Sequence, residues 1–282
     1  MQKEFIDVDK GRLFYQMAGE GERDIVWVHG LPLNSNSWYA QVEHFKPNFR
    51  NIAIDLRGYG QSSEIPNDTP SVTDLYVADL LTLFNTLKLN KPILVGFASG
   101  GHATLKFAAA HGDLISQLVL INASPCFMKQ KNWDWGFDKA ALDAFIAKLN
   151  AADTLEQLSD IILTSAMRDV SGKQKQALTA WFNTMLASAK KETLLSFFNN
   201  IAYDDDRSLL KDITTATLII CSRLDKEVPT AVAMYLRENM PNAQLFELND
   251  IDHFGFATQS ALVNQVIEQF IQPSCTINLP SN

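Results

Sequence analysis

The sequence predicts an α/β fold with a mostly parallel, eight-stranded sheet flanked by helices. Two observations lead to this prediction. Short apolar runs alternate with segments of helical periodicity along most of the 282 residues, and such alternation is typical of a parallel sheet with helical crossovers. The alternation stops only between Cys126 and Tyr203, where the apolar residues follow helical spacing alone. We therefore expect one α/β core that carries a helical cap, inserted after the sixth strand.

Each element is predicted from a local pattern. The strands are apolar runs, and the first two form an antiparallel hairpin around Gly11: Phe5–Val8, Leu13–Met17, Ile25–Val28, Asn51–Ile54, Ile93–Val95, Leu118–Ile121, Thr217–Cys221 and Ala243–Leu248. The core helices follow amphipathic spacing: Trp38–Phe45, a helix after Ser71 that reaches Leu87, Ser99–Ala110, Pro229–Leu236 and Ala261–Ile271. The predicted organisation is a discontinuous core of residues 1–125 and 204–273, a cap of residues 126–203 and a flexible tail of residues 274–282.

The turn between the fifth strand and its helix reads Gly96-Phe97-Ala98-Ser99-Gly100. Its glycine spacing is that of the G-x-S-x-G turn, which raises a central nucleophile above the end of a parallel sheet. A β-carbon at Gly96 or Gly100 would clash with the adjacent strand or helix. The central position holds Ala98, which has no nucleophilic atom. Ser99 is one residue late, and its side chain is expected to point away from the apex, so we favour position 98.

Two polar side chains follow the last two predicted strands, Asp225 and His253. Functional groups of an open α/β sheet gather at the carboxyl ends of its strands. Along the chain the nucleophile position comes first, the acid Asp225 second and the base His253 third. This order suits an imidazole that takes a proton and a carboxylate that orients the imidazole. Asp250 and Asp252 are alternative acids, but Asp252 is adjacent to His253 and should diverge from it. We favour Asp225.

An oxyanion hole needs two backbone donors. The N–H groups of Leu31 and Ser99 are the candidates, and Pro32 cannot donate. We expect His29 to have a structural role beside this turn. We expect His102, four residues after the apex, to be packed or exposed rather than catalytic.

Composition narrows the function classes. The net charge of -8 argues against nucleic acid as a partner. The three cysteines are widely spaced and indicate neither a disulfide framework nor a metal site. No cofactor and no metal are expected.

The first residues lack an apolar signal region and no apolar run has the length of a membrane span, so we expect a cytoplasmic protein without a membrane partner. The run of residues 204–206 is expected to be a solvated loop or helix start.

Together these motifs resemble the α/β-hydrolase family. The matching segments are His29–Pro32, Asp55–Ser62, Gly96–Gly101, Asp225 and His253. The resemblance implies a Ser–Asp–His triad in which Ala98 replaces the serine, and the hydrolysis of a carboxylic ester whose acyl part lies under the cap. The substrate-binding residues that we expect are Phe97, Leu31, Phe145, Trp181 and Phe182.

A narrower resemblance involves the start of the cap. The segments Asn122–Phe127 and Trp133–Gly136, with a helix that begins near Phe137, are similar to the pimeloyl-acyl-carrier-protein methyl ester esterases of biotin synthesis. This resemblance implies a substrate attached to an acidic acyl-carrier protein, which basic cap residues would meet. Four lysines qualify, or equally form a solvated helix face: Lys129, Lys131, Lys139 and Lys148.

Alanine at the apex leaves two explanations open: an engineered change that traps a ligand, or a natural chain without a serine nucleophile. Loss of a triad nucleophile costs on the order of a millionfold in turnover and leaves binding largely intact. We therefore expect this chain to bind an ester and hardly hydrolyse it. The alternatives are a non-catalytic ligand-binding protein, or a lactonase or other hydrolase of the same fold. An aspartate ancestor, as in dehalogenases, is formally open too.

Overall fold

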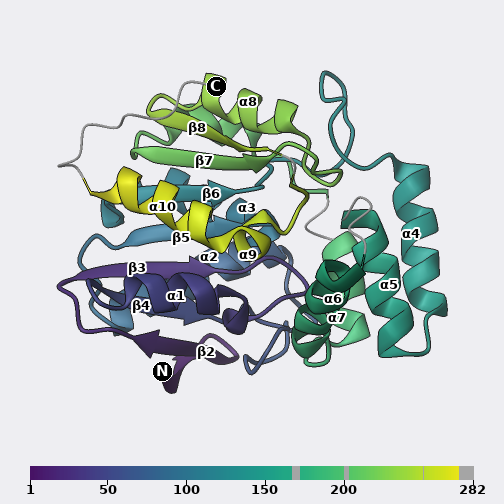
Figure 1. The fold of residues 1–282 in the computed structure, drawn as a ribbon, viewed down its shortest axis with the longest axis horizontal. Coiled ribbons are helices and arrows are strands. Elements are labelled where there is room, and N and C mark those ends of the chain that lie inside the picture. The colour runs from purple at the N-terminus through teal and green to yellow at the C-terminus, as the bar shows by residue number, and fades with distance from the viewer. Residues whose placement is uncertain (167–171, 200–202, 250, 273–282) are drawn as a thin grey trace.

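A computed structural model of the chain describes residues 1–166, 172–199, 203–249 and 251–272 (Figure 1). In these residues eight strands form one sheet in the order β1-β2-β4-β3-β5-β6-β7-β8. The hairpin strands β1 and β2 are antiparallel, β2 is antiparallel to β4, and the remaining neighbours are parallel. The strands are β1 (Gln2–Val8), β2 (Gly11–Ala18), β3 (Arg23–Val28), β4 (Phe49–Ile54), β5 (Ile93–Phe97), β6 (Gln117–Ile121), β7 (Thr217–Ser222) and β8 (Ala243–Leu248). The predicted fold class is confirmed.

Helices cover both faces of the sheet, as Figure 1 shows. The core helices are α1 (Tyr39–Phe45), α2 (Val72–Thr86), α3 (Ala98–His111), α8 (Thr230–Asn239), α9 (Gly255–Thr258) and α10 (Ser260–Ile271). Helices α1 and α10 lie on one face, and α2 and α3 pack side by side on the other. Every residue of β5 is buried because both faces of this central strand are covered. The apolar runs of the sequence are therefore the interior strands.

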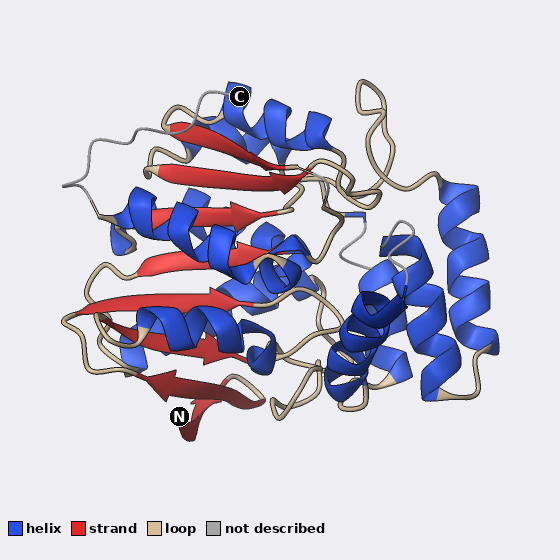
Figure 2. Ribbon diagram, in the orientation of Figure 1, coloured by secondary structure: helices blue, strands red, loops and turns tan. Residues whose placement is uncertain are grey.

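Beyond the carboxyl ends of the parallel strands lie four helices in the described part of the chain (Figure 2). They are α4 (Lys139–Ala151), α5 (Leu155–Ala166), α6 (Gly172–Leu186) and α7 (Lys191–Asn199), and we call them the cap. The cap follows β6, as predicted, and covers the edge where a parallel sheet presents its functional loops. The tail predicted for residues 274–282 lies outside the described residues.

The two connections between core and cap run side by side. Cys126, on the way out, forms an antiparallel bridge with Asp205, on the way back. The N–H of Asp206 also donates to the carbonyl of Pro125 at 2.9 Å. Trp133 is fully buried in the outward connection and donates from Nε1 to the carbonyl of Cys126 at 3.1 Å. These contacts tie both ends of the cap to one place on the core.

None of the helices in the described residues combines the length and the apolar character that crossing a membrane requires.

Candidate active site

The strand β5 ends at Phe97 and the helix α3 begins at Ala98, which has a φ of 48°. This left-handed conformation is unfavourable for a residue with a β-carbon, and such strain is typical of functional turns. A Cβ at Gly100 would overlap the carbonyl of His29, and one at Gly96 would overlap Thr104 and the backbone of α3. The glycines are thus needed because the start of α3 lies close to the end of β3 and packs directly on β5. The predicted strand–turn–helix has the geometry of a nucleophile elbow with alanine at its apex.

The loops after β7 and β8 bring Asp225 and His253 together. Oδ2 of Asp225 lies 2.7 Å from Nδ1 of His253, and both residues are buried. Oδ1 of Asp225 accepts the backbone N–H groups of Glu227 at 2.8 Å and Val228 at 3.0 Å, which fix the carboxylate. This is the arrangement that orients an imidazole and stabilises its charged form. The alternative acid Asp250 lies outside the described residues.

Asn122, at the end of β6, supports the histidine loop. Its side-chain amide donates to the carbonyl of His253 at 2.8 Å and to Oγ of Ser222 at 3.0 Å. Its Oδ1 accepts the N–H of Ser222 at 2.8 Å. Asn122 was not predicted to support the site, although its place at the end of a strand was the available signal.

A second carboxylate lies on the other side of the imidazole. Oε2 of Glu227 is 3.3 Å from Nε2 of His253, and Oε1 accepts the hydroxyl of Ser165 on α5 at 3.0 Å. Burial raises the pKa of Glu227, and the charge of His253 partly opposes this rise. Burial alone would lower the pKa of His253, but the carboxylates of Asp225 and Glu227 outweigh it and raise that pKa to about 9. The ring of His253 therefore lies between two acidic side chains, and Glu227 was not among the predicted site residues.

The oxyanion turn contains an unexpected contact. The N–H of Leu31 donates to Oγ of Ser99 at 3.0 Å. The Leu31 N–H, one of the two candidate oxyanion donors, is therefore already bonded to the side chain of Ser99. The backbone N–H of Ser99 is the other candidate. A ligand oxygen at this place must exchange with the Ser99 hydroxyl or share the Leu31 N–H with it.

His29 is fully buried behind this turn. Its Nε2 accepts the N–H of Leu56 at 3.0 Å, and its Nδ1 lies 2.9 Å from the carbonyl of Gly30. Because Nε2 accepts a hydrogen bond it carries no proton, and Nδ1 is the donor. Burial lowers the pKa of His29, which also favours the neutral ring. His29 thus joins the oxyanion turn to the loop after β4.

A cavity lies between the elbow and the cap. Its lining residues are Leu31, Pro32, Ala98, Ser99, Phe127, Phe137, Phe145, Ile162, Leu194, Phe197, Phe198, Glu227, Val228 and His253. The cavity volume of about 40 Å³ is room for a few water molecules. An acyl chain can therefore enter only if the cap side chains move apart.

Three residues predicted to bind substrate are not among those that line this cavity. Phe97 is buried below it, with its ring centroid 4.8 Å from that of His253. Trp181 and Phe182 of α6 pack on Phe254, with centroids 5.9 Å and 5.7 Å away. Both residues were predicted to lie on the apolar side of a helix. Helical spacing could not show which part of the protein that side contacts. Leu31 and Phe145 do line the cavity.

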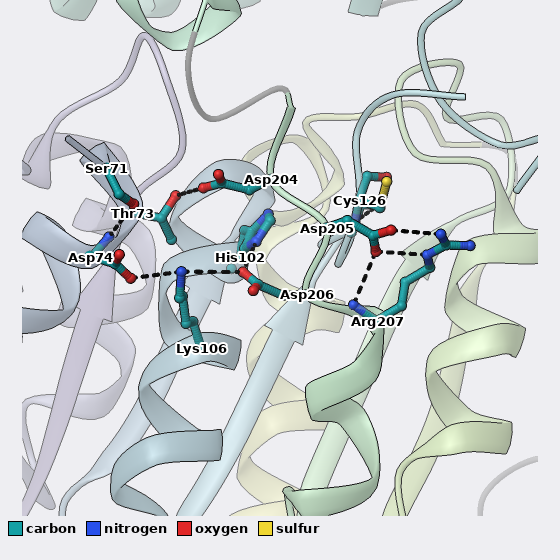
Figure 3. A network of polar contacts seen from close by, with 12 residues as sticks. Ser71, Thr73, Asp74, His102, Lys106, Cys126, Asp204, Asp205, Asp206 and Arg207 are labelled. Atoms are coloured by element: carbon teal, nitrogen blue, oxygen red, sulfur yellow. Dashed lines mark hydrogen bonds and ion pairs between the residues drawn. The ribbon is translucent and has the colours of Figure 1, made fainter. Parts of the chain in front are cut away.

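A polar network joins the returning end of the cap to the elbow helix (Figure 3). Nε2 of His102 lies 2.7 Å from Oδ2 of Asp206, and Lys106 is 2.7 Å from Asp74 and 3.8 Å from Asp206. His102 is fully buried and its ring stacks on Phe127 of the cavity wall. Of the two positions expected for His102, packed or exposed, the structure shows the packed one.

The neighbouring acids of this network are paired as well. Asp204 accepts the hydroxyl of Thr73 at 2.6 Å, and Asp205 pairs with Arg207 at 2.6 Å (Figure 3). Residues 204–206 were predicted to be a solvated loop or a helix start. Asp205 is exposed, and Asp206 is the N-cap position of a 3-10 helix over Arg207–Asp212. Asp204 and Asp206 also bond to side chains of the core, which was not predicted. Among the described residues no cluster of three or more histidine, cysteine or acidic side chains is arranged to hold a metal ion.

An elbow, a His–Asp pair and an oxyanion turn at the carboxyl edge of a parallel sheet define a hydrolase-type α/β protein. Residues 25–259 match the family described as the alpha/beta hydrolase fold, and the chain belongs to this family. It is 32% identical to the AB hydrolase superfamily protein YisY of Bacillus subtilis (strain 168), over 92% of this chain and 94% of that protein.

Two further similarities extend over almost the full length. The chain is 29% identical to the pimeloyl-[acyl-carrier protein] methyl ester esterase of Vibrio cholerae, over 91% of this chain and 97% of that protein. It also resembles the solved structure of the esterase EaEST from Exiguobacterium antarcticum, with a TM-score of 0.85 and 25% identity, over 94% of this chain and 98% of the other. The similarity therefore includes both core and cap.

Proposed function

We propose that this chain has the binding site of a serine-type carboxylic ester hydrolase, with alanine in the nucleophile position. The observation that carries the proposal is the His253–Asp225 pair, 2.7 Å apart, in the same site as an elbow whose apex, Ala98, has a φ of 48°. In this arrangement the chain binds an ester and hardly turns it over, because the residue at the apex, Ala98, has no oxygen to attack the acyl carbon.

The roles follow from the chemistry of acyl transfer. A serine at position 98 would attack the ester carbonyl, and His253 would take its proton and return it to the leaving alcohol. Asp225 would hold the Nδ1–H and stabilise the imidazolium. The N–H groups of Leu31 and Ser99 would receive the developing oxyanion. The first of these donors has to leave the Ser99 hydroxyl, to which it is bonded at 3.0 Å.

The substrate that we propose is an acyl ester whose chain lies among the phenylalanines of the cavity wall. A pimeloyl ester on an acyl-carrier protein is the finer proposal, supported by the similarity to the Vibrio cholerae esterase that is named for this substrate. Of the lysines considered for such a partner, Lys139 is exposed and forms an ion pair with Asp143 at 2.9 Å. That pair lies one helical turn apart on α4 and would have to open or be shared with the partner.

The test compares the chain with its Ala98→Ser variant in the hydrolysis of p-nitrophenyl butyrate. We expect turnover to rise at least about a thousandfold, since a lost triad nucleophile costs on the order of a millionfold. The double variant Ala98→Ser/His253→Gln is the matched control and should remain as slow as the unaltered chain. Equal rates for the unaltered chain and Ala98→Ser would refute the proposal.

A second candidate, a ligand-binding protein that performs no hydrolysis, is favoured by one specific pair of contacts. Glu227 lies on Nε2 of His253 and Ser99 on the N–H of Leu31, so both groups that a reaction would use are bonded within the chain. Tight binding of an ester by both forms, without turnover in Ala98→Ser, would favour this candidate.

A further inference from the structure

The described lining of the cavity includes two ionisable side chains, Glu227 and His253. The other polar lining residue is Ser99, and no lysine or arginine of the described residues lines the cavity. An anionic ligand would meet the carboxylate of Glu227 without a fixed cation except His253, which Asp225 already holds at 2.7 Å. The charges of the wall therefore disfavour an anion.

Aromatic rings form a large part of the same wall. The lining phenylalanines are Phe127, Phe137, Phe145, Phe197 and Phe198. Four of these rings form a chain of contacts. The ring centroids are 5.8 Å apart for Phe127 and Phe197, 4.9 Å for Phe197 and Phe198, and 5.1 Å for Phe145 and Phe198. The face of each ring carries negative potential and attracts a cation within about 6 Å of its centroid.

The partners of Glu227 are ones that a ligand can replace. Its contact with Nε2 of His253 is 3.3 Å, longer than the 2.7 Å between His253 and Asp225. Its other oxygen accepts the hydroxyl of Ser165 on cap helix α5 at 3.0 Å. Neither contact is to a cation whose charge is fixed, so a cationic ligand can compete for this carboxylate. A cation beside Glu227 would then become its counter-ion, while His253 keeps Asp225.

We propose that Glu227 determines specificity, and that the pocket selects an ester ligand that carries an organic ammonium group. The ammonium lies between the Glu227 carboxylate and the phenylalanine wall, and the ester group lies over Ala98. The inference rests on the proposed function for the placement of the ester. A carboxylate beside aromatic rings provides charge attraction and cation–π attraction in a largely buried cavity.

The experiment uses the full chain with Ala98, so that the ligands are not consumed. Isothermal titration calorimetry compares butyrylcholine with its neutral isostere neohexyl butyrate, in which carbon replaces the nitrogen. We expect butyrylcholine to bind at least about tenfold more tightly, as a desolvated cation–π contact with an added carboxylate implies. In Glu227→Gln the two affinities should agree within about twofold, because butyrylcholine no longer meets a negative charge. The matched control Glu238→Gln, on the exposed side of α8, should keep the preference.

Three outcomes would overturn the inference: equal affinities in the unaltered chain, a preference that survives Glu227→Gln, or binding of neither ligand. Thermal melting of Glu227→Gln establishes that the variant is folded before its affinities are compared. The hydrolysis of p-nitrophenyl butyrate by Ala98→Ser distinguishes the two proposals, since that ester is neutral. Turnover without cation preference refutes the ammonium site alone, and cation preference without turnover refutes the hydrolase proposal alone.

Discussion

Nε2 of His253 lies 3.3 Å from Oε2 of Glu227. The other ring nitrogen, Nδ1, is bonded to Asp225. In a triad, Nε2 is the atom that takes the proton of the nucleophile. A serine placed at position 98 would therefore compete with Glu227 for the same nitrogen. Glu227 thus influences both the charge of the base and its availability.

The first prediction concerns the pH dependence of Ala98→Ser. Burial lowers the pKa of His253, but Asp225 and Glu227 outweigh it and raise that pKa to about 9. A general base must be deprotonated, so kcat/KM for p-nitrophenyl butyrate should rise with pH through a midpoint at about 9, after correction for spontaneous hydrolysis. Adding Glu227→Gln removes a negative neighbour and should shift the midpoint to lower pH. An unchanged midpoint would show that Glu227 does not act on His253.

The second prediction concerns Ser99, whose hydroxyl accepts the Leu31 N–H at 3.0 Å. Replacing Ser99 by alanine in the Ala98→Ser background frees this donor for the oxyanion, which forms only in the transition state. We expect kcat to rise by about tenfold, the value of one ordinary hydrogen bond, with little change in KM. Steady-state kinetics on p-nitrophenyl butyrate measure both constants. A fall in kcat would instead indicate that the Ser99 hydroxyl takes part in the reaction.

The third prediction concerns the network beside the elbow helix. Asp206→Asn removes the charge that faces fully buried His102 and nearby Lys106. Loss of a buried, charge-assisted bond should lower the free energy of unfolding by about 1–3 kcal/mol at neutral pH. Urea denaturation measures this change, and Asp212→Asn, at an exposed acid of the same segment, is the control.

The sign of the pH effect on this variant is fixed by the direction of the pKa shift. Burial raises the pKa of Asp206, but the bond to His102 and the charge of Lys106 hold it below its usual value. The stabilisation is therefore present above the unfolded pKa of about 3.9 and is lost as pH falls through the folded pKa. The difference between the unaltered chain and Asp206→Asn should shrink below about pH 4. A difference that stays constant into acid would contradict the assignment of the charge to Asp206.

The fold was predictable because its determinants are local. The interior strands are continuous apolar runs, and Gly96 and Gly100 mark a turn whose close contacts exclude a β-carbon. The pairing of Asp225 with His253 was predictable because parallel strands bring their carboxyl ends to one edge.

The rest of the site was not predictable because it depends on contacts between separate loops and on side-chain direction. Glu227 is two residues after Asp225, but only the fold places its carboxylate beside Nε2 of His253. Helical periodicity marked Trp181 and Phe182 as apolar, but it could not tell the cavity from the core around Phe254. Similarly, nothing local in the acidic run of residues 204–206 indicates that His102 and Lys106 lie opposite Asp206.

The most direct test of the central claim, that position 98 is the nucleophile position of a hydrolase site, is covalent labelling. The unaltered chain and Ala98→Ser are treated with diisopropyl fluorophosphate, and intact-mass and peptide mass spectrometry locate the adduct. The account predicts one adduct on residue 98 of Ala98→Ser, its loss when His253→Gln is added, and no adduct on the unaltered chain. An adduct on Ser99 of the unaltered chain, or none on Ala98→Ser, would contradict the account.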